Sequence, residues 1–582
     1  MRFKAMHAVG LICLTLTSAA PPPPLPARPK AWALRRDSAS PVRCNADDRD
    51  DSRFGKRGYR GRSLMVPMMA PPSMLVPAPS PAMEPSVATP VVVTAQPPAN
   101  GSVASVPMSV APIGSPDNTE RYDGKPVASI QSVASAPVST FSIDVDTGSY
   151  ANVRRFLNRG QIPPADAVRT EEMINYFRYD YPRPSDRDEP FSVTTDVART
   201  PWNPDSRLLR IGLRGYDVAT DARPPANLVF LVDVSGSMDE PDKLPLVKSA
   251  LAMLADQLRP TDRVSIVVYA GNAGIVLEPT ANKAYMRTAL DCLQAGGSTA
   301  GGEGIKLAYD TARARFVKGG INRIFLATDG DFNVGISDTK ALEALVKSNR
   351  DDGITLTTLG FGEGNYNDAM MEHIADVGNG NYAYIDSAQE AKKMLDDELS
   401  ATLVPIAKDV KVQVEFNPAQ VKQYRLIGYE NRALAEEDFN NDAVDAGDMG
   451  AGHQVTALYE IMPTSGSGWM DEHRYPANRI PAATGGGELG FVKLRYKLPN
   501  ESQSRLISRV VPASLMATAT APTGDMAFVT AVAAYGQKLR GDKYLGGYRL
   551  ADATALAGNP QGYWRQEFVQ LTRLADKRIA QN

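Results

Sequence analysis

Between about residues 227 and 400, short apolar runs alternate with stretches whose apolar positions recur at helical spacing. The runs suit strands buried on both faces and comprise residues 228–232, 264–269, 324–327 and 354–359. Helical spacing lies between them, as in the set Leu244, Val247, Leu251, Leu254 and Leu258 and in the set Ala341, Leu342, Leu345 and Val346. Strands that alternate with helices form a parallel sheet with helices on both faces. The pattern therefore predicts an α/β fold, a doubly wound, mostly parallel sheet, for residues 227–400.

The residues after Pro405 follow a different period. Apolar and polar residues alternate in residues 410–416, 455–461 and 491–496. Such alternation favours an antiparallel sheet with one face in solvent. Helical spacing returns in residues 527–538 and 564–577. We therefore expect residues 401–582 to form a C-terminal domain that is β-rich and ends in helices.

Before the α/β region, folded structure is expected to begin near Thr140. Residues 141–145 alternate like a strand, and residues 152–157 and 170–177 have helical spacing. The segment 140–226 holds too few strands to close a core alone, and so does the C-terminal domain. Because the ends of a domain are often adjacent, we expect both flanks to pair in one β-rich domain, into which the α/β region is inserted.

The first part of the chain has no globular pattern. Residues 21–139 mix Pro, Ala, Ser, Val and Met with almost no aromatic residues. This composition buries too little surface to fold, so a disordered linker is predicted. Residues 1–20 differ, because basic residues precede a short apolar stretch, residues 8–16, and small residues follow. This order is typical of a secretory signal peptide, with cleavage after Ala19.

A signal peptide implies export to the periplasm or cell envelope. The residues before Cys13 match a lipoprotein signal poorly. Tethering to the membrane through the N-terminus is therefore left open. No run in the sequence approaches the ~18 apolar residues of a spanning helix.

The composition of the 582-residue chain is ordinary for a globular protein, with 43% hydrophobic and 22% charged residues. The formal net charge is −3, so we expect no nucleic-acid partner. After the signal peptide the cysteines are Cys44, in the predicted linker, and Cys292, in a helical pattern. We expect no disulfide framework and no cysteine-rich metal site, and we interpret Cys292 as a small buried apolar residue.

Hydroxyl and carboxylate side chains gather where the first predicted strand ends. Asp233, Ser235 and Ser237 occupy alternate positions there. In an open parallel sheet, ligands bind beyond the carboxyl ends of the strands, and we expect Asp233 to face solvent at that place. Further loops at residues 296–299 and 328–330 offer matching groups. Such hard oxygen donors suit Mg²⁺, or else Mn²⁺ or Ca²⁺, and not zinc or copper.

The set Asp233, Ser235, Ser237, Thr299 and Asp329, in this order and spacing, resembles the metal-ion-dependent adhesion site (MIDAS) of von Willebrand factor type A (VWA) domains. The resemblance implies that Ser235, Ser237 and Thr299 contact one divalent cation. It also implies that Asp233 and Asp329 hold the cation directly or through water. VWA domains have a Rossmann-like fold, so the α/β region is identified as a VWA domain.

The resemblance extends to both flanks. The stretches IDVDTGSYANVRRFL within residues 141–157, EEMINYF at residues 171–177 and DFNND at residues 438–442 are similar to the YfbK-like branch of bacterial VWA proteins. That branch implies an N-terminal segment before the VWA domain and a C-terminal domain after it. The likeness covers about residues 140–580. The weak lipoprotein signal differs from the lipid-anchored members of the branch.

The ligand set favours binding over catalysis. Neutral hydroxyls leave most of the charge of a dication uncompensated, and Mg²⁺ keeps water where the protein offers no ligand. A partner's Asp or Glu can replace such a water. We therefore expect a non-enzymatic, cation-dependent protein-binding or scaffolding module of the bacterial cell envelope.

The alternative function is a metal-dependent hydrolase, which needs a general base near the ion. The histidines lie outside the metal loops: His7, His373, His453 and His473. An acidic or basic side chain beside the ion, beyond the predicted ligands, would distinguish the two functions.

Other acidic or glycine-rich loops imitate ligand sites incompletely. Residues 144–148 lack the later ligands of a calcium loop and are interpreted as a strand end with a turn. Residues 438–442 begin like an EF-hand loop, but Ala443 stands where glycine is needed and Met449 where the bidentate Glu belongs. Residues 360–364 lack the spacing of a dinucleotide-binding loop and are interpreted as a glycine-rich turn.

Overall fold

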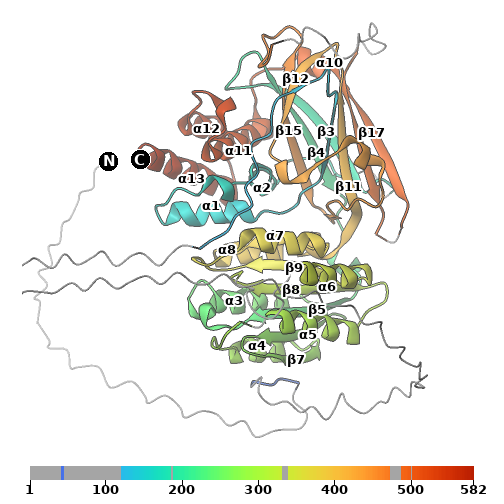
Figure 1. Ribbon diagram of the computed structural model, residues 1–582, viewed down its shortest axis with the longest axis vertical. Coiled ribbons are helices and arrows are strands. Elements are labelled where there is room, and N and C mark those ends of the chain that lie inside the picture. The colour runs from blue at the N-terminus through green and yellow to red at the C-terminus, as the bar shows by residue number, and fades with distance from the viewer. Residues whose placement is uncertain are drawn as a thin grey trace, which may run out of the picture. The chain divides into compact units, whose positions relative to one another are not determined.

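The computed structural model describes residues 41–44, 119–184, 188–299, 301–330, 339–471, 487–499 and 501–581 (Figure 1). The predicted signal peptide and most of the predicted linker lie outside the described residues. The described part contains an α/β sheet, antiparallel sheets and a group of helices.

The α/β region is built on a 6-stranded sheet in the order β10-β9-β8-β5-β6-β7. The parallel strands are β5 (Ala226–Asp233), β6 (Arg263–Tyr269), β8 (Ile321–Thr328), β9 (Thr355–Gly360) and β10 (Tyr382–Tyr384). At the other edge, β7 (Ala273–Thr280) pairs with β6 in the antiparallel direction. Each predicted apolar run coincides with one of the parallel strands. The predicted doubly wound, mostly parallel sheet is therefore confirmed.

The alternation of side chains along β5 explains why helices cover both faces of this sheet. Phe230 and Val232 share an apolar core with α3 (Leu244–Asp256), α4 (Lys283–Cys292) and α8 (Ala388–Lys392). Val229 and Leu231 share another core with α5 (Gly301–Ala314), α6 (Thr339–Asp351) and α7 (Asp368–Val377). Because successive strand residues face opposite sides, an unbroken apolar strand needs a layer of helices on each face.

Strands from both flanks pair in the same antiparallel sheets. β4 (Arg207–Gly215), which precedes the α/β region, pairs with β15 (Gln454–Pro463), which follows it. In the same way β2 (Val138–Ser142) pairs with β11 (Pro405–Phe416). The sheets, in the orders β1-β12-β15-β4-β3 and β13-β2-β11-β16-β17, enclose a common apolar core. The α/β region is therefore inserted into a β-rich domain made from both flanks, as the strand patterns predict.

The other strands described in these sheets are short or lie toward the edges. They are β1 (Gln131–Ser132), β3 (Phe191–Arg199), β12 (Val421–Ile427), β13 (Ala433–Leu434), β16 (Glu488–Lys497) and β17 (Ser504–Pro512), with β14 (Met449–Gly450) beside β11. The short helices α9 (Leu399–Leu403) and α10 (Ala513–Ala517) precede β11 and follow β17.

Helices from both flanks pack together beside the sheets (Figure 1). They are α1 (Gly148–Asn158), α2 (Thr170–Asn175), α11 (Gly524–Arg540), α12 (Leu550–Ala557) and α13 (Tyr563–Ile579). Their core is aromatic: the rings of Tyr150 and Tyr176 stack with centroids 4.0 Å apart, and Phe177 meets Phe528 edge to face at 5.0 Å. In the part of the chain that the structure describes, no helix has the length and apolar character that crossing a membrane requires.

The folded part extends further toward the N-terminus than the sequence predicts. The amide of Thr119 donates to the carbonyl of Gly364 at 2.8 Å, and the amide of Arg121 donates to the carbonyl of Tyr366 at 2.9 Å. β1 then pairs with β12 of the C-terminal flank. The predicted linker, residues 21–139, is therefore too long at its C-terminal end. Backbone hydrogen bonds, the buried ion pair of Glu120 with Arg155 and the buried side chain of Val133 hold this last part, and such isolated contacts leave no apolar period in the sequence.

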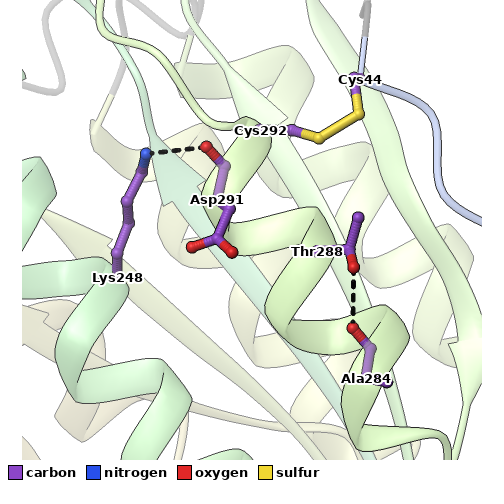
Figure 2. Close-up of a disulfide and its surroundings, with 6 residues drawn as sticks. All are labelled: Cys44, Lys248, Ala284, Thr288, Asp291 and Cys292. Carbon is purple, nitrogen blue, oxygen red and sulfur yellow. Dashed lines mark hydrogen bonds between the residues drawn. A yellow bond between two sulfur atoms is a disulfide. The ribbon is translucent and has the colours of Figure 1, made fainter. Parts of the chain in front are cut away.

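Cys44 and Cys292 form a disulfide, although 248 positions separate them in the sequence (Figure 2). Their Cα atoms lie 5.3 Å apart. The segment before Cys44 lies along the edge strand β7, where the amide of Arg43 donates to the carbonyl of Val276 at 2.8 Å. The sequence predicts no disulfide framework, and it does not predict this single bond. The interpretation of the half-buried Cys292 as a buried apolar residue is wrong. The pairing depends on a strand addition that no local pattern reveals.

Candidate metal site

Asp233 is the last residue of β5. It lies at the side of the sheet where the carboxyl ends of the parallel strands β6 and β8 also lie. Its Oδ1 accepts a hydrogen bond from the amide of Ser235 at 2.9 Å. Its Oδ2 accepts hydrogen bonds from the hydroxyls of Thr328 at 2.9 Å and Tyr269 at 3.1 Å. Asp233 is fully buried. The expectation that it faces solvent is therefore wrong, because the neighbouring strand ends and their loops cover it.

Backbone hydrogen bonds join the loop after β5 to the loop that carries Thr299. The amide of Gly236 donates to the carbonyl of Gly297 at 3.0 Å, and the amide of Gly296 donates to the carbonyl of Val234 at 2.8 Å. Gly297 has a φ of +88°, in the left-handed region that favours glycine. The glycines of this loop therefore let its backbone fold against the loop after β5.

The predicted hydroxyl ligands belong to these joined loops. The Oγ atoms of Ser235 and Ser237 lie 3.1 Å apart, in hydrogen-bond contact. Ser235 and Thr299 are buried, whereas Ser237 is exposed. The hydroxyl groups therefore extend from the interior to the surface, and the candidate site opens to solvent on the side of Ser237.

Asp329 directly follows β8 and is fully buried. Its Oδ2 accepts hydrogen bonds from the ammonium of Lys243 at 2.9 Å and from the side-chain amide of Asn365 at 3.1 Å. The same ammonium donates to Oδ1 of Asn365 at 3.1 Å. Neither partner is predicted from the sequence. A topological signal could find Asn365, because it follows β9, the parallel neighbour of β8, and the loops after parallel strands share one edge of the sheet.

Burial raises the pKa of Asp233, and the nearby carboxylate of Asp329 raises it too. Hydrogen bonds from Ser235 and Thr328 act in the opposite direction, and the resulting pKa is about 6. Asp233 is thus a carboxylate whose negative charge is only partly stabilised by its surroundings. A divalent cation at this place would favour the charged form.

The donor set fits a hard divalent cation. It combines the buried carboxylates of Asp233 and Asp329 with the hydroxyls of Ser235, Ser237 and Thr299. Among the described residues, no group of three or more His, Cys, Asp or Glu side chains is arranged to hold a metal ion. A site here would therefore depend on hydroxyl ligands, which Mg²⁺, Mn²⁺ and Ca²⁺ accept.

The acidic loops that imitate calcium sites incompletely already have basic side chains as partners. In the loop at residues 438–442, the ammonium of Lys411 donates to the carbonyls of Asp438 at 3.1 Å and Asn441 at 2.5 Å. Between β2 and α1, the guanidinium of Arg432 forms ion pairs with Asp144 at 3.4 Å and with Asp146 at 3.1 Å. Basic side chains therefore already contact both loops.

Family models match consecutive parts of the chain. The model of the von Willebrand factor type A domain matches residues 227–397. A model described as von Willebrand factor matches residues 116–210, and the model of the C-terminal domain of the uncharacterized protein YfbK matches residues 401–577. The fold and these matches define the class: the inserted α/β region is a VWA domain, a domain type that serves as a protein-interaction module.

The uncharacterized protein YfbK of Escherichia coli (strain K12) is 48% identical to this chain over 471 residues, which cover 78% of the chain and 80% of that protein. The chain belongs to the YfbK-like family of VWA proteins. The protein sll0103 of Synechocystis sp. is 30% identical over 322 residues, which cover 53% of the chain and 70% of that protein. The solved structure of a von Willebrand factor type A protein from Catenulispora acidiphila is 19% identical with a TM-score of 0.39, covering 68% of the chain and 91% of that structure.

Proposed function

We propose that this protein is a non-enzymatic, divalent-cation-dependent protein-binding or scaffolding module of the bacterial cell envelope. Asp233, Ser235, Ser237, Thr299 and Asp329 hold one Mg²⁺, with Mn²⁺ or Ca²⁺ as alternatives. The bound ion supplies a ligand position that an Asp or Glu of a partner protein takes from water. The partner is a protein and not a nucleic acid.

The observation that supports this proposal most is the meeting of separate loops around buried carboxylates. Asp233 and Asp329 stand at adjacent strand ends, and backbone hydrogen bonds bring the loop of Thr299 to the same place. Burying carboxylates without a nearby cation is costly. Lys243 supplies one positive charge beside Asp329, and a dication would supply the rest. Exposed Ser237 leaves the site accessible to a partner.

The contacts of Lys243 and His373 argue against the metal-dependent hydrolase. A hydrolase needs a general base in reach of the attacking water. Lys243 is a basic side chain beside the predicted ligands, but its ammonium donates to Asp329 and Asn365 and offers no lone pair for a proton. His373 lies on the surface of α7, where it pairs with Glu343 at 2.9 Å. These contacts favour binding over hydrolysis.

The disulfide supports the location in the cell envelope. Disulfides persist in oxidising compartments such as the periplasm and are rare in the cytosol. The Cys44–Cys292 bond therefore agrees with the export that a signal peptide at residues 1–20 implies. Membrane tethering through the N-terminus stays a proposal, because it concerns residues outside the described part of the chain.

A retention experiment tests the proposed function. The purified protein is immobilised and incubated with envelope extract in Mg²⁺ or in a chelator. We expect proteins that are retained with Mg²⁺, released by the chelator, and not retained by Asp233→Asn. The matched control is Asp239→Asn, which removes an exposed carboxylate of the same loop and should retain the same proteins. Equal retention in Mg²⁺ and in chelator would contradict cation dependence. Cleavage of a retained protein would favour the hydrolase.

A further inference from the structure

Lys243 is a buried lysine built into the rim of the candidate metal site. Its side chain is only 7% exposed, and that of Asp329 is 0% exposed. The ammonium lies between Oδ2 of Asp329 and Oδ1 of Asn365. It is thus fixed by a carboxylate and an amide, and not by the water that usually surrounds a lysine.

The stem of Lys243 occupies a slot that the backbone leaves open for it. Gly362, in the loop after β9, has a φ of +73°, and a Cβ at this position would lie 2.4 Å from both Cγ and Cε of Lys243. The amide of Val247, in the first turn of α3, donates to the carbonyl of Lys243, and the amide of Lys243 donates to the carbonyl of Glu240. The backbone of α3 and the loop after β9 therefore both hold the ammonium at Asp329.

These contacts engage carboxylate oxygens of both aspartates, and the amide of Ser235 donates to Oδ1 of Asp233 as well. Oδ2 of Asp329 serves Lys243 and Asn365, and Oδ2 of Asp233 serves the hydroxyls of Thr328 and Tyr269. A dication at Oδ2 of Asp329 would also meet the like charge of the ammonium, which repels it. A cation that took both oxygens of Asp329 would therefore have to displace the ammonium of Lys243 from Oδ2.

The loss of Oδ2 of Asp329 as a ligand affects the binding of Mg²⁺ and Ca²⁺ differently. Ca²⁺ takes about six to eight oxygen ligands and often uses both oxygens of a carboxylate. Mg²⁺ takes about six ligands in a near-octahedral arrangement and is satisfied by single oxygens and water. We infer that Lys243 is a positioning residue that selects Mg²⁺ over Ca²⁺, by holding Oδ2 of Asp329 away from the ion. This inference rests on the proposed function, and it identifies the cation of that site.

The test is the ratio of the Kd for Ca²⁺ to the Kd for Mg²⁺, measured by calorimetric titration of the whole protein with each chloride salt. We expect the wild type to prefer Mg²⁺. In Lys243→Met, which keeps the length of the stem and removes the charge, the ratio should fall by about tenfold, well inside the range over which ligand charge and rigidity tune calcium sites. In Asn365→Ala, which releases Oδ2 in part, we expect a smaller fall in the same direction. The matched control is Lys248→Met on α3, because that ammonium donates to the carbonyl of Asp291, away from the site (Figure 2).

The outcomes separate the two proposals. If the wild type binds neither ion, the proposed function fails and this inference fails with it. If the wild type binds Mg²⁺ and the ratio is unchanged in Lys243→Met and Asn365→Ala, the role of Lys243 is overturned while the metal site stands. If Lys243→Met does not fold, Asn365→Ala decides the question alone. A general loss of stability would weaken both ions equally and leave the ratio constant, so a fall in the ratio identifies selection.

Discussion

The loops at residues 233–237 and 438–442 show that one spacing of oxygen donors leads to different results in different surroundings. Both loops place Asp, Ser or Asn at alternate positions. Asp233 accepts hydrogen bonds from an amide and from hydroxyls, all neutral groups. In the second loop, the ammonium of Lys411 reaches the carbonyls of Asp438 and Asn441. The same spacing of potential ligands is therefore surrounded by neutral donors in one loop and contacted by a basic side chain in the other.

The carboxylates of these loops also differ in their electrostatics. Burial raises the pKa of Asp233 to about 6. In contrast, the hydroxyl of Ser504 and the guanidinium of Arg495 lower the pKa of Asp442, which is exposed. The charge of Asp442 is thus already stabilised by its neighbours. The charge of Asp233 still lacks such compensation, which is the state in which a carboxylate gains most from a bound cation.

The largest expected difference between the two loops follows from removing the carboxylate of Asp233, which lacks a compensating positive charge. Mg²⁺ should raise the melting temperature of the wild type, because a ligand at about 100 times its Kd stabilises the folded state by about 2.7 kcal/mol. In Asp233→Asn this Mg²⁺-dependent rise should disappear. Thermal melts in Mg²⁺ and in chelator measure it. The matched variant Asp442→Asn should keep the full rise, and a rise in Asp233→Asn equal to that of the wild type would place the ion elsewhere.

The choice of asparagine follows from the structure. The sequence alone suggests that alanine at this position would spare the metal-free fold, because Asp233 and Asp329 repel each other without a cation. In the structure, Asp233 accepts hydrogen bonds from the hydroxyls of Thr328 and Tyr269. Alanine would leave buried hydroxyls without this acceptor, at a cost of about 1–3 kcal/mol. Asparagine keeps an oxygen for them and gives up only the acceptor for the amide of Ser235, so it removes the charge with a smaller loss of hydrogen bonds than alanine.

The sequence predicts the VWA sheet because its strands are buried on both faces and their apolar runs are unbroken. Once those strands are placed, the parallel topology puts their carboxyl ends at one edge. Asp233 and Asp329 follow strand ends directly, so their approach is predictable without side-chain detail. The β-rich domain is predictable in outline, since neither flank alone holds enough strands for a core.

Other features depend on contacts that no local pattern encodes. Lys243 reaches Asp329 only because Gly362 leaves a slot for its stem. Cys44 meets Cys292 only because the segment before Cys44 adds to the edge of β7. A composition-based prediction treats that segment as linker, since a few backbone hydrogen bonds add no apolar residues. The exposure of a strand end cannot be predicted from the local sequence either, because the loops that cover it come from distant parts of the chain.

A second way to test the comparison is to remove the internal cation from the other loop. Lys411→Met should destabilise the protein by about 1–3 kcal/mol, because the carbonyls of Asp438 and Asn441 lose a charged donor. Urea unfolding measures the change. Lys493→Met is the matched control on the neighbouring strand β16, since its ion pair with Glu415 is more exposed and should contribute less than about 1 kcal/mol. Equal effects of both variants would show that the loop does not depend on the ammonium of Lys411.

The smallest expected effect is a dependence on pH that belongs to one loop and not to the other. The folded-state pKa of Asp233, about 6, lies above its ordinary value of 3.8. Below about pH 6 a cation must therefore displace a proton from this carboxyl group. The affinity for Mg²⁺ should then fall by up to about tenfold per pH unit. For the metal-free protein the sign is opposite: the folded state binds this proton more tightly than the unfolded chain, so stability contributed by Asp233 declines as pH rises from 3.8 through about 6. The pKa of Asp442 is lowered from 3.8, so its contribution is lost only as pH falls below that value. Calorimetric titrations with Mg²⁺ from about pH 7.5 down to about pH 5 should therefore show weakening affinity in the wild type and in Asp442→Asn alike. A constant affinity over this range would mean that Asp233 is already ionised at pH 5, and the electrostatic contrast between the two loops would be wrong.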